Sequence, residues 1–134
     1  MILHGTAITG LGEATALTQL PWVVSQIEAK LGMNPYPGTF NIRLSGQGEI
    51  DQWEALKASP GIPLQEPTSS NCAATCYSAR LNDELPGAIL LPDVPGYPAD
   101  QVEVIAAVHV RAALRLKDGD PITIDVRGSY NGLD

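Results

Sequence analysis

In Pro35-Tyr36-Pro37-Gly38-Thr39-Phe40-Asn41-Ile42-Arg43-Leu44, a rigid turn leads directly into an alternating strand. The two prolines restrict φ and Gly38 permits a positive φ, so residues 34–38 are predicted to form a stiff turn. Apolar and polar residues alternate over residues 40–44, which indicates a strand with one buried face. The stretch therefore predicts a short, half-buried strand held by a stiff turn.

The polar face of this strand carries two oxygen-bearing side chains. Thr39 and Asn41 are expected to point away from the apolar face that Phe40 and Ile42 form. Two neutral oxygen ligands on a rigid turn suit Mg²⁺ when phosphates and waters complete its octahedron. A β-turn with a polar outer face is the alternative, and the residues alone leave both readings open.

Short strands and short helical segments account for the rest of the chain. The apolar patterning predicts strands at residues 2–9, 40–44, 74–81, 87–91, 102–108 and 122–126, with proline-rich residues 60–67 as irregular or edge structure. Helices are predicted at residues 21–31 and 51–58, with one or two further helical turns at 110–116. In the second helix, Asp51 is the candidate N-cap, and Trp53 and Leu56 are expected to face inward.

The helix at residues 21–31 has the clearest periodicity. Pro21 suits a first helical turn and Gly32 is a plausible C-terminal stop. One apolar stripe is predicted to pack on the strands, formed by Leu20, Val23, Val24, Ile27 and Leu31.

The composition is that of one small, turn-rich domain. The chain has 134 residues, of which 44% are hydrophobic and 17% charged, with 13 glycines and 11 prolines. No composition break divides it, so a single domain over residues 1–134 is expected. About six strands with short helical insertions favour a mainly β fold, a small closed six-stranded β-barrel, over a βαβ sheet.

The charge balance narrows the possible partners. Eight basic residues against 15 acidic ones give a net charge of −7, which disfavours nucleic-acid binding but allows a small phosphorylated ligand. No apolar run approaches the ~18 residues that span a bilayer, and no secretion signal is evident. A cytoplasmic monomer or small homo-oligomer that binds small molecules, with no membrane partner, is therefore expected.

Two further features carry possible chemistry. Gly10-Leu11-Gly12-Glu13 follows the first predicted strand and offers backbone amides for an anion, although a plain turn is the alternative. Glu103 shares a face of its predicted strand with Ile105, Ala107 and His109, which is largely apolar. A carboxylate there needs an internal partner or a ligand, unless the position is an exposed edge. No G-x-x-x-x-G-K-[ST] motif is present, so the chain is not a P-loop nucleotide binder.

Several of these segments match one family in order and spacing. They are residues 9–13 (TGLGE), 31–44 (LGMNPYPGTFNIRL) and 102–120 (VEVIAAVHVRAALRLKDGD), while residues 76–91 fit more loosely. Over nearly its whole length the chain resembles the archaeal-type CTP-dependent riboflavin kinase family. The resemblance implies a barrel of the cradle-loop type, which phosphorylates riboflavin to FMN and converts CTP to CDP.

The resemblance also implies roles for individual residues. Thr39 and Asn41 would bind Mg²⁺, and Glu103 would contact the flavin and is the one candidate catalytic carboxylate. The nucleotide would lie along Leu11, Gly12, Glu13, Ala14, Thr15, Ala16, Val108, His109, Val110 and Arg111.

The chain departs from the family pattern at three places. Ala14, Thr15 and Ala16 stand where the family has Gly, a basic residue and an aromatic. Pro95 stands at the position of a flavin-contacting threonine, and His109 stands where a lysine is usual. Two outcomes stay open: a working kinase with altered contacts, or a non-catalytic nucleotide- or flavin-binding paralogue, a regulatory module that kept the barrel.

Overall fold

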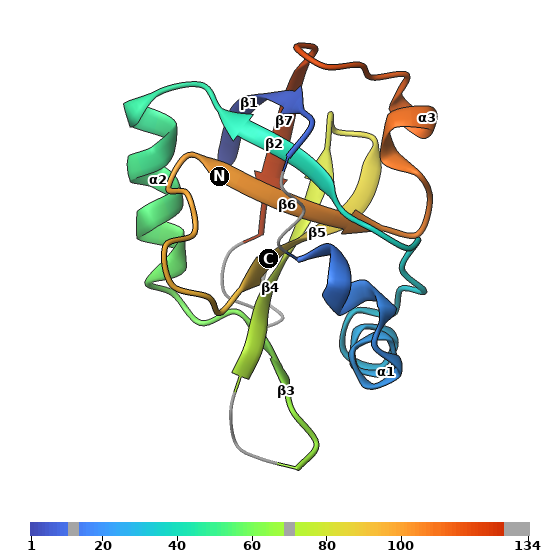
Figure 1. The fold of residues 1–134 in the computed structure, drawn as a ribbon. Helices are drawn as coiled ribbons and strands as arrows, with labels where there is room; N and C mark the ends of the chain where they lie inside the picture. Colours follow the sequence, from blue (N-terminus) through green and yellow to red (C-terminus); the bar gives the residue numbers. More distant parts are fainter. Residues whose placement is uncertain (11–13, 69–71, 128–134) are drawn as a thin grey trace.

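The computed structural model describes residues 1–10, 14–68 and 72–127, and it shows a mainly β molecule with short helices around it (Figure 1). The strands are β1 (Ile2–Ile8), β2 (Phe40–Leu44), β3 (Ile62–Gln65), β4 (Cys72–Leu81), β5 (Leu85–Pro92), β6 (Gln101–Ala106) and β7 (Pro121–Val126). The helices are a 3-10 helix, η1 (Thr15–Gln19), and three α-helices, α1 (Pro21–Leu31), α2 (Gln47–Lys57) and α3 (Val110–Leu114).

Six of the strands close into an antiparallel barrel. The order is β4-β5-β6-β2-β1-β7, and the end of β4 pairs with β7 from Ala79, opposite Val126, to Leu81, opposite Ile124. The first part of β4 pairs instead with β3, and together they extend beyond the barrel (Figure 1). The predicted six-stranded barrel is confirmed, and the proline-rich segment forms an edge strand, where a missing N–H breaks no central ladder.

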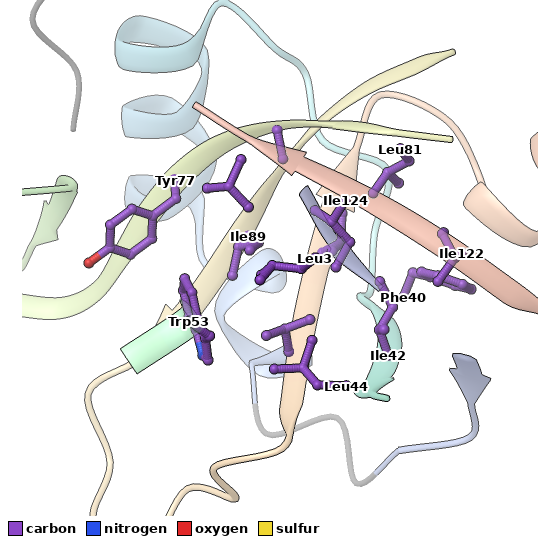
Figure 2. Packing of buried hydrophobic residues seen from close by; sticks show 14 of the residues in the cluster. Leu3, Phe40, Ile42, Leu44, Trp53, Tyr77, Leu81, Ile89, Ile122 and Ile124 are labelled. Carbon is purple, nitrogen blue, oxygen red and sulfur yellow. The ribbon is translucent and has the colours of Figure 1, made fainter. Parts of the chain in front are cut away.

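The interior of the barrel is filled by branched aliphatic side chains. They alternate with outward residues along every strand, as the β period requires. Figure 2 shows them converging from several strands, with Trp53 of α2 and Tyr77 of β4 in edge-to-face contact, their ring centroids 5.3 Å apart. The largest fully buried members of this cluster include Leu3, Ile42, Leu81, Ile89, Ile122 and Ile124.

A second, smaller core lies outside the barrel, between its wall and the η1–α1 segment. Val23 and Ile27 of α1 are fully buried there. They belong to one cluster with Leu64, Leu90 and Ile105, which come from β3, β5 and β6. The wall of the barrel is therefore covered on both sides here, which explains why all six residues of β6 are buried.

Helix α2 begins earlier than the sequence predicted. Its first residue is Gln47 and its N-cap is Gly46, so the prediction of Asp51 as the cap was wrong. Asp51 lies inside the helix, where its carboxylate accepts a hydrogen bond from Gln47 Nε2 at 2.8 Å. Glu49 fills the first turn instead and accepts the backbone N–H of His4, which ties the helix to β1. The inward positions of Trp53 and Leu56 are confirmed.

Two other sequence expectations need correction. Helix α1 has the predicted bounds, but Leu20 is 38% exposed because it is the extended N-cap residue and lies off the helical face. Strand β6 ends at Ala106, so Ala107 and His109 do not share a strand face with Glu103. The chain turns there because His109 caps α3, its Nδ1 accepting the N–H of Ala112 at 3.2 Å.

Among the described residues, no helix is both long and apolar enough to cross a membrane.

Candidate functional site

The candidate site lies where β2 and β6 run side by side. Their register places Asn41 directly opposite Glu103. Along β6, Val102 and Val104 point into the barrel, so the alternation turns Glu103 outward, toward the start of η1. The same alternation on β2 turns Phe40 and Ile42 inward and Asn41 outward, as predicted. Two polar side chains therefore share the outer face of a pair of barrel strands.

Glu103 is fully buried and is held by three donors. The backbone N–H of Ala14 donates to both carboxylate oxygens, at 3.0 Å to Oε1 and 3.1 Å to Oε2. The hydroxyl of Thr39 donates to Oε1 and that of Tyr97 donates to Oε2, each at 2.7 Å. The reading of Glu103 as an exposed edge residue was wrong, and the expectation of an internal partner is confirmed. Charge-assisted bonds of this kind offset the cost of burying a carboxylate.

The hydroxyl of Thr39 links Glu103 to Thr15. The two threonine oxygens lie 3.0 Å apart. A hydroxyl can donate only one hydrogen bond, and Thr39 donates its bond to Glu103. Thr15 must therefore be the donor in this pair. The direction of the chain is therefore fixed, from Thr15 to Thr39 to Glu103.

Thr18 joins the helix η1, which also contains Thr15, to the stiff turn at residues 34–38. Its hydroxyl donates to the Thr15 carbonyl at 2.7 Å and accepts the N–H of Gly38 at 2.8 Å. Gly38 has a φ of 97°, a value that favours glycine, as the sequence predicted for this turn. The turn before β2 and the helix η1 are thus fastened to each other as well as to Glu103.

Asn41 is fixed by two close neighbours. Its Oδ1 accepts a hydrogen bond from Gln101 Nε2 at 3.2 Å. Gly10 packs so closely that a Cβ there would lie 2.3 Å from the same oxygen. Only glycine leaves room for Asn41 in this orientation, which explains the residue type at position 10.

The oxygen atoms of Thr39 and Asn41 suit a hard cation. Asn41 Oδ1 keeps one lone pair after its bond to Gln101, and Thr39 Oγ1 keeps one after accepting from Thr15. Neutral oxygens are ligands that Mg²⁺ accepts when phosphates and waters supply the remainder. No group of three His, Cys, Asp or Glu side chains in the described residues offers an alternative metal site. The Mg²⁺ site therefore stays a prediction. The oxygen atoms of Thr39 and Asn41 are of the kind that such a site requires.

A cavity of about 120 Å³ lies beside Thr39. It brings together the turn before β2, the end of β6 and the start of α3. Several residues predicted to bind nucleotide thus share one cavity with a predicted metal ligand. The lining consists of Tyr36, Pro37, Gly38, Thr39, Phe40, Val104, Ala106, Val108, His109, Val110 and Arg111.

Arg111 is held in place at the rim of this cavity. Its Nη2 donates to the carbonyl of Ile8 at 3.0 Å and to the carboxylate of Asp118, and its guanidinium lies 5.7 Å from the ring centroid of Phe40. Thr9 donates to the other oxygen of Asp118 at 2.8 Å. The hydrogen bonds from Arg111 and Thr9 lower the pKa of Asp118 below its usual value. Arg111 is therefore a cation of fixed position, and it already has an anionic partner in Asp118.

His109 serves the local structure. Besides capping α3, its ring meets that of Tyr36 edge-on, with the centroids 5.4 Å apart. Both rings line the cavity, so the two aromatic edges shape its wall.

A second hollow lies beside Tyr97, one of the three donors to Glu103. It is a groove of about 520 Å³, lined by Lys57, Thr75, Leu91, Pro92, Asp93, Val94, Gly96 and Tyr97. Tyr97, whose hydroxyl reaches Glu103, thus belongs to the wall of this groove. Pro95 lies exposed in the same loop, where it has no side-chain donor.

The remaining predicted nucleotide residues divide into two groups. Leu11, Gly12 and Glu13 lie outside the described residues. Ala14 is fully buried and offers its N–H to Glu103, whereas Ala16 is exposed on η1.

Comparison with known proteins gives the family. Residues 7–126 match the model of the CTP-dependent riboflavin kinases, whose description reads "Domain of unknown function DUF120". This chain belongs to the CTP-dependent riboflavin kinase family.

Family members with curated names are similar over most of this chain. A riboflavin kinase of Saccharolobus solfataricus is 32% identical over 92% of this chain and 73% of its own length. Those of Pyrobaculum calidifontis and Methanosarcina acetivorans are 39% and 34% identical, over 92% and 93% of this chain. This chain spans only 59% and 53% of these last two proteins.

Tyr97 and Asp118 are functional candidates that were not predicted from the sequence of this riboflavin kinase family member. Tyr97 lies in a loop without periodicity, two residues from Pro95, and nothing in the sequence pairs it with Glu103. Asp118 is part of the matching LKDGD block, which was a signal, but only the structure brings it to Arg111.

Proposed function

We propose that this chain is a CTP-dependent riboflavin kinase. The observation that carries the proposal is that Glu103 joins two hollows through its hydrogen bonds, one to Thr39 of the cavity and one to Tyr97 of the groove. A reaction between two substrates requires neighbouring sites whose walls are held in register, because the reacting atoms must be aligned. Family membership supplies the substrates, a nucleotide and riboflavin. We assign the nucleotide to the cavity, which several of the expected nucleotide residues line, and the flavin to the groove.

The proposed reaction is a direct phosphoryl transfer. The oxygen of the terminal ribityl hydroxyl bonds to the γ-phosphorus of CTP, and the bond from that phosphorus to the β–γ bridging oxygen breaks. The hydroxyl proton is released, and FMN and CDP are the products. The transition state of such transfers is loose, so alignment and charge neutralisation contribute more than a strong base.

Thr39 and Asn41 are the residues that would hold Mg²⁺, which when bound neutralises phosphate charge. The chain's own residues supply the alignment. The stiff turn fixes Thr39, the close approach of Gly10 fixes Asn41, and Arg111 stands at the rim as a cation of fixed position. Each of these groups is held by contacts within the chain itself, and such pre-organisation lowers the entropic cost of alignment.

Glu103 acts in this proposal by orienting its neighbours. Each of its two oxygens already accepts two hydrogen bonds, so no acceptor position is left for a substrate proton. Its proposed catalytic role is therefore to hold Thr39 and the start of η1, rather than to act as a general base.

The test is a phosphotransfer assay with Mg²⁺, riboflavin and either CTP or ATP. FMN formation with CTP at a rate well above that with ATP is expected. Thermal stabilisation by CTP, ATP, GTP, riboflavin and FMN, each with and without Mg²⁺, identifies the ligands independently of turnover. No FMN with any nucleotide would contradict the proposal. The cytoplasmic location and the monomeric or small homo-oligomeric state stay predictions, the latter open to light scattering.

A second candidate is a binding module without turnover. Thr15 and Ala16 carry neither charge nor aromatic surface at positions expected to face the nucleotide, and this favours weaker binding. Stabilisation by a flavin or nucleotide without FMN formation would support the binding module over the kinase.

A further inference from the structure

The carboxylate of Glu103 has no unused acceptor position. A carboxylate has about four lone-pair sites, two on each oxygen. Ala14 and Thr39 occupy Oε1, and Ala14 and Tyr97 occupy Oε2. The orientation of the group therefore depends on all three donors, and loss of one leaves an oxygen with a single partner.

Of these donors, Tyr97 comes from a different side of the site. Thr39 lines the cavity, and Ala14 directly precedes η1, which is hydrogen-bonded to Thr39 and Gly38 of the cavity wall. Tyr97 belongs instead to the loop at residues 93–100, part of which lines the groove. Tyr97 is half-buried, while the preceding residues 93–96 are exposed. Its hydroxyl is thus the link that runs from the groove loop to the cavity segments.

We propose that Tyr97 is a positioning residue for the nucleotide side of the site, which it reaches through Glu103. The phenol hydroxyl fixes the carboxylate, and the carboxylate fixes the Ala14 amide and the Thr39 hydroxyl. This inference rests on the proposed function only in naming CTP as the nucleotide. It assigns Tyr97 a role other than contact with the groove's occupant, although its ring forms part of the groove wall.

Removing only the hydroxyl isolates this role. In Tyr97→Phe the ring still lines the groove, but Oε2 of Glu103 keeps only the 3.1 Å bond from Ala14. The carboxylate then gains freedom to rotate, and the bonds to Ala14 and Thr39 weaken with it. Tyr77→Phe is the matched control, because it makes the same change at a tyrosine of the barrel core that lines neither hollow.

Two measurements test the proposal. The first is amide hydrogen exchange of Ala14 in the ligand-free protein, with the Ala7 amide of β1 as internal reference. The second compares the dissociation constant of CTP with Mg²⁺ and the KM for riboflavin. In Tyr97→Phe, Ala14 is expected to exchange several-fold faster while Ala7 is unchanged. CTP is expected to bind about tenfold more weakly, the effect of one lost bond to a charged group, with the riboflavin KM unaltered.

The outcomes separate this inference from the proposed function. Unchanged Ala14 exchange in Tyr97→Phe overturns the inference, whether or not CTP binds. A raised riboflavin KM with unchanged CTP affinity also overturns it, because Tyr97 would then be a direct contact of the acceptor. If the parent protein binds no nucleotide, the kinase proposal fails, and faster exchange at Ala14 still supports Tyr97 as the residue that orders Glu103.

Discussion

Neighbouring residues of β6 make different kinds of contact on the two faces of the strand. Val102 and Val104 point into the barrel and belong to its apolar core. Glu103, between them in sequence, points outward and meets three hydrogen-bond donors. The inner face stabilises the fold by removing apolar area from water, and the outer face stabilises one arrangement of polar groups.

This difference shows how the fold separates stability from function. The barrel interior tolerates changes that conserve volume, because packing is non-directional. The polar cluster around Glu103 depends on direction, because each of its hydrogen bonds requires a particular geometry. Substitutions in the two apolar cores, at positions that line neither hollow, should therefore change stability with little effect on ligands, and substitutions in the polar cluster the reverse.

The largest expected effects are in the two apolar cores. Ile124→Ala removes a fully buried side chain from the barrel and should lower the free energy of unfolding by about 2–5 kcal/mol. Ile27→Ala, in the second core beneath α1, should cost about the same, because Ile27 is also fully buried. Urea unfolding measures both. A cost near zero at Ile27 would show that α1 is not packed on the barrel in solution.

The next effect belongs to the outer face. Asn41→Ala should abolish Mg²⁺-dependent nucleotide binding and hardly change thermal stability, because Asn41 is only half-buried. Gly10→Ala should weaken the same binding at least tenfold, since its Cβ would displace the Asn41 side chain. Isothermal titration with and without Mg²⁺ measures both changes.

Gly48→Ala is the matched control for the glycine substitution. Gly48 lies in α2, and a Cβ added there would meet nothing within 4 Å, so the change should leave ligand binding alone. Replacing a helical glycine should also stabilise the protein by about 0.5–1 kcal/mol. Normal Mg²⁺-dependent binding in both Asn41→Ala and Gly10→Ala would mean that the metal is held elsewhere.

The sequence predicted the inner face far better than the outer one. The barrel, the bounds of α1 and the inward positions of Phe40 and Ile42 all follow from apolar periodicity, which is a local property. Two of the three partners of Glu103 are not local: Ala14 is 89 residues away and Thr39 is 64 residues away. The pairing of β2 with β6 brings Thr39 close, and the packing of the η1 segment on the barrel brings Ala14 close. Both are tertiary arrangements that no local pattern in the sequence encodes.

The errors in the prediction have the same origin. Asp51 was the best capping side chain near the start of α2, but Gly46 begins the helix. In α2, the packing of Ile50 against the barrel core is a tertiary contact that outweighs the local preference for a polar cap. Leu20 fits the helical stripe by spacing alone, yet the extended backbone at that residue turns it toward solvent.

A third prediction concerns a variant that adds an interaction on the outside of the barrel and should raise the affinity for CTP. Thr15→Arg with Ala16→Tyr would supply the cation and the aromatic surface that these positions lack. CTP affinity should rise about tenfold to a hundredfold, because a charge-assisted contact contributes roughly 1.5–3 kcal/mol. The exposed position of Ala16 leaves room for the larger ring.

The control for this variant keeps a long polar side chain and removes its charge. Thr15→Gln with Ala16→Tyr has the same ring and also loses the bond from Thr15 to Thr39, so its difference from the arginine variant isolates the charge. The gain from arginine should shrink as salt rises, whereas the glutamine variant should be insensitive to salt. Equal affinities for the two double variants would show that no phosphate lies near position 15.

The smallest expected effect concerns Asp118, at the surface. Hydrogen bonds from Arg111 and Thr9 hold its pKa below the ordinary value of 3.8. A carboxyl group whose pKa is lowered on folding contributes stability above its unfolded pKa, and that contribution is lost as the pH falls through the folded pKa. Asp118→Asn should therefore flatten the acid-side loss of thermal stability below about pH 4, by a small amount because solvent screens the pair. Asp83→Asn, in the turn between β4 and β5, removes the same charge without touching Arg111. If both variants change the acid-side profile equally, the effect comes from net charge, and the Arg111–Asp118 pair contributes nothing of its own.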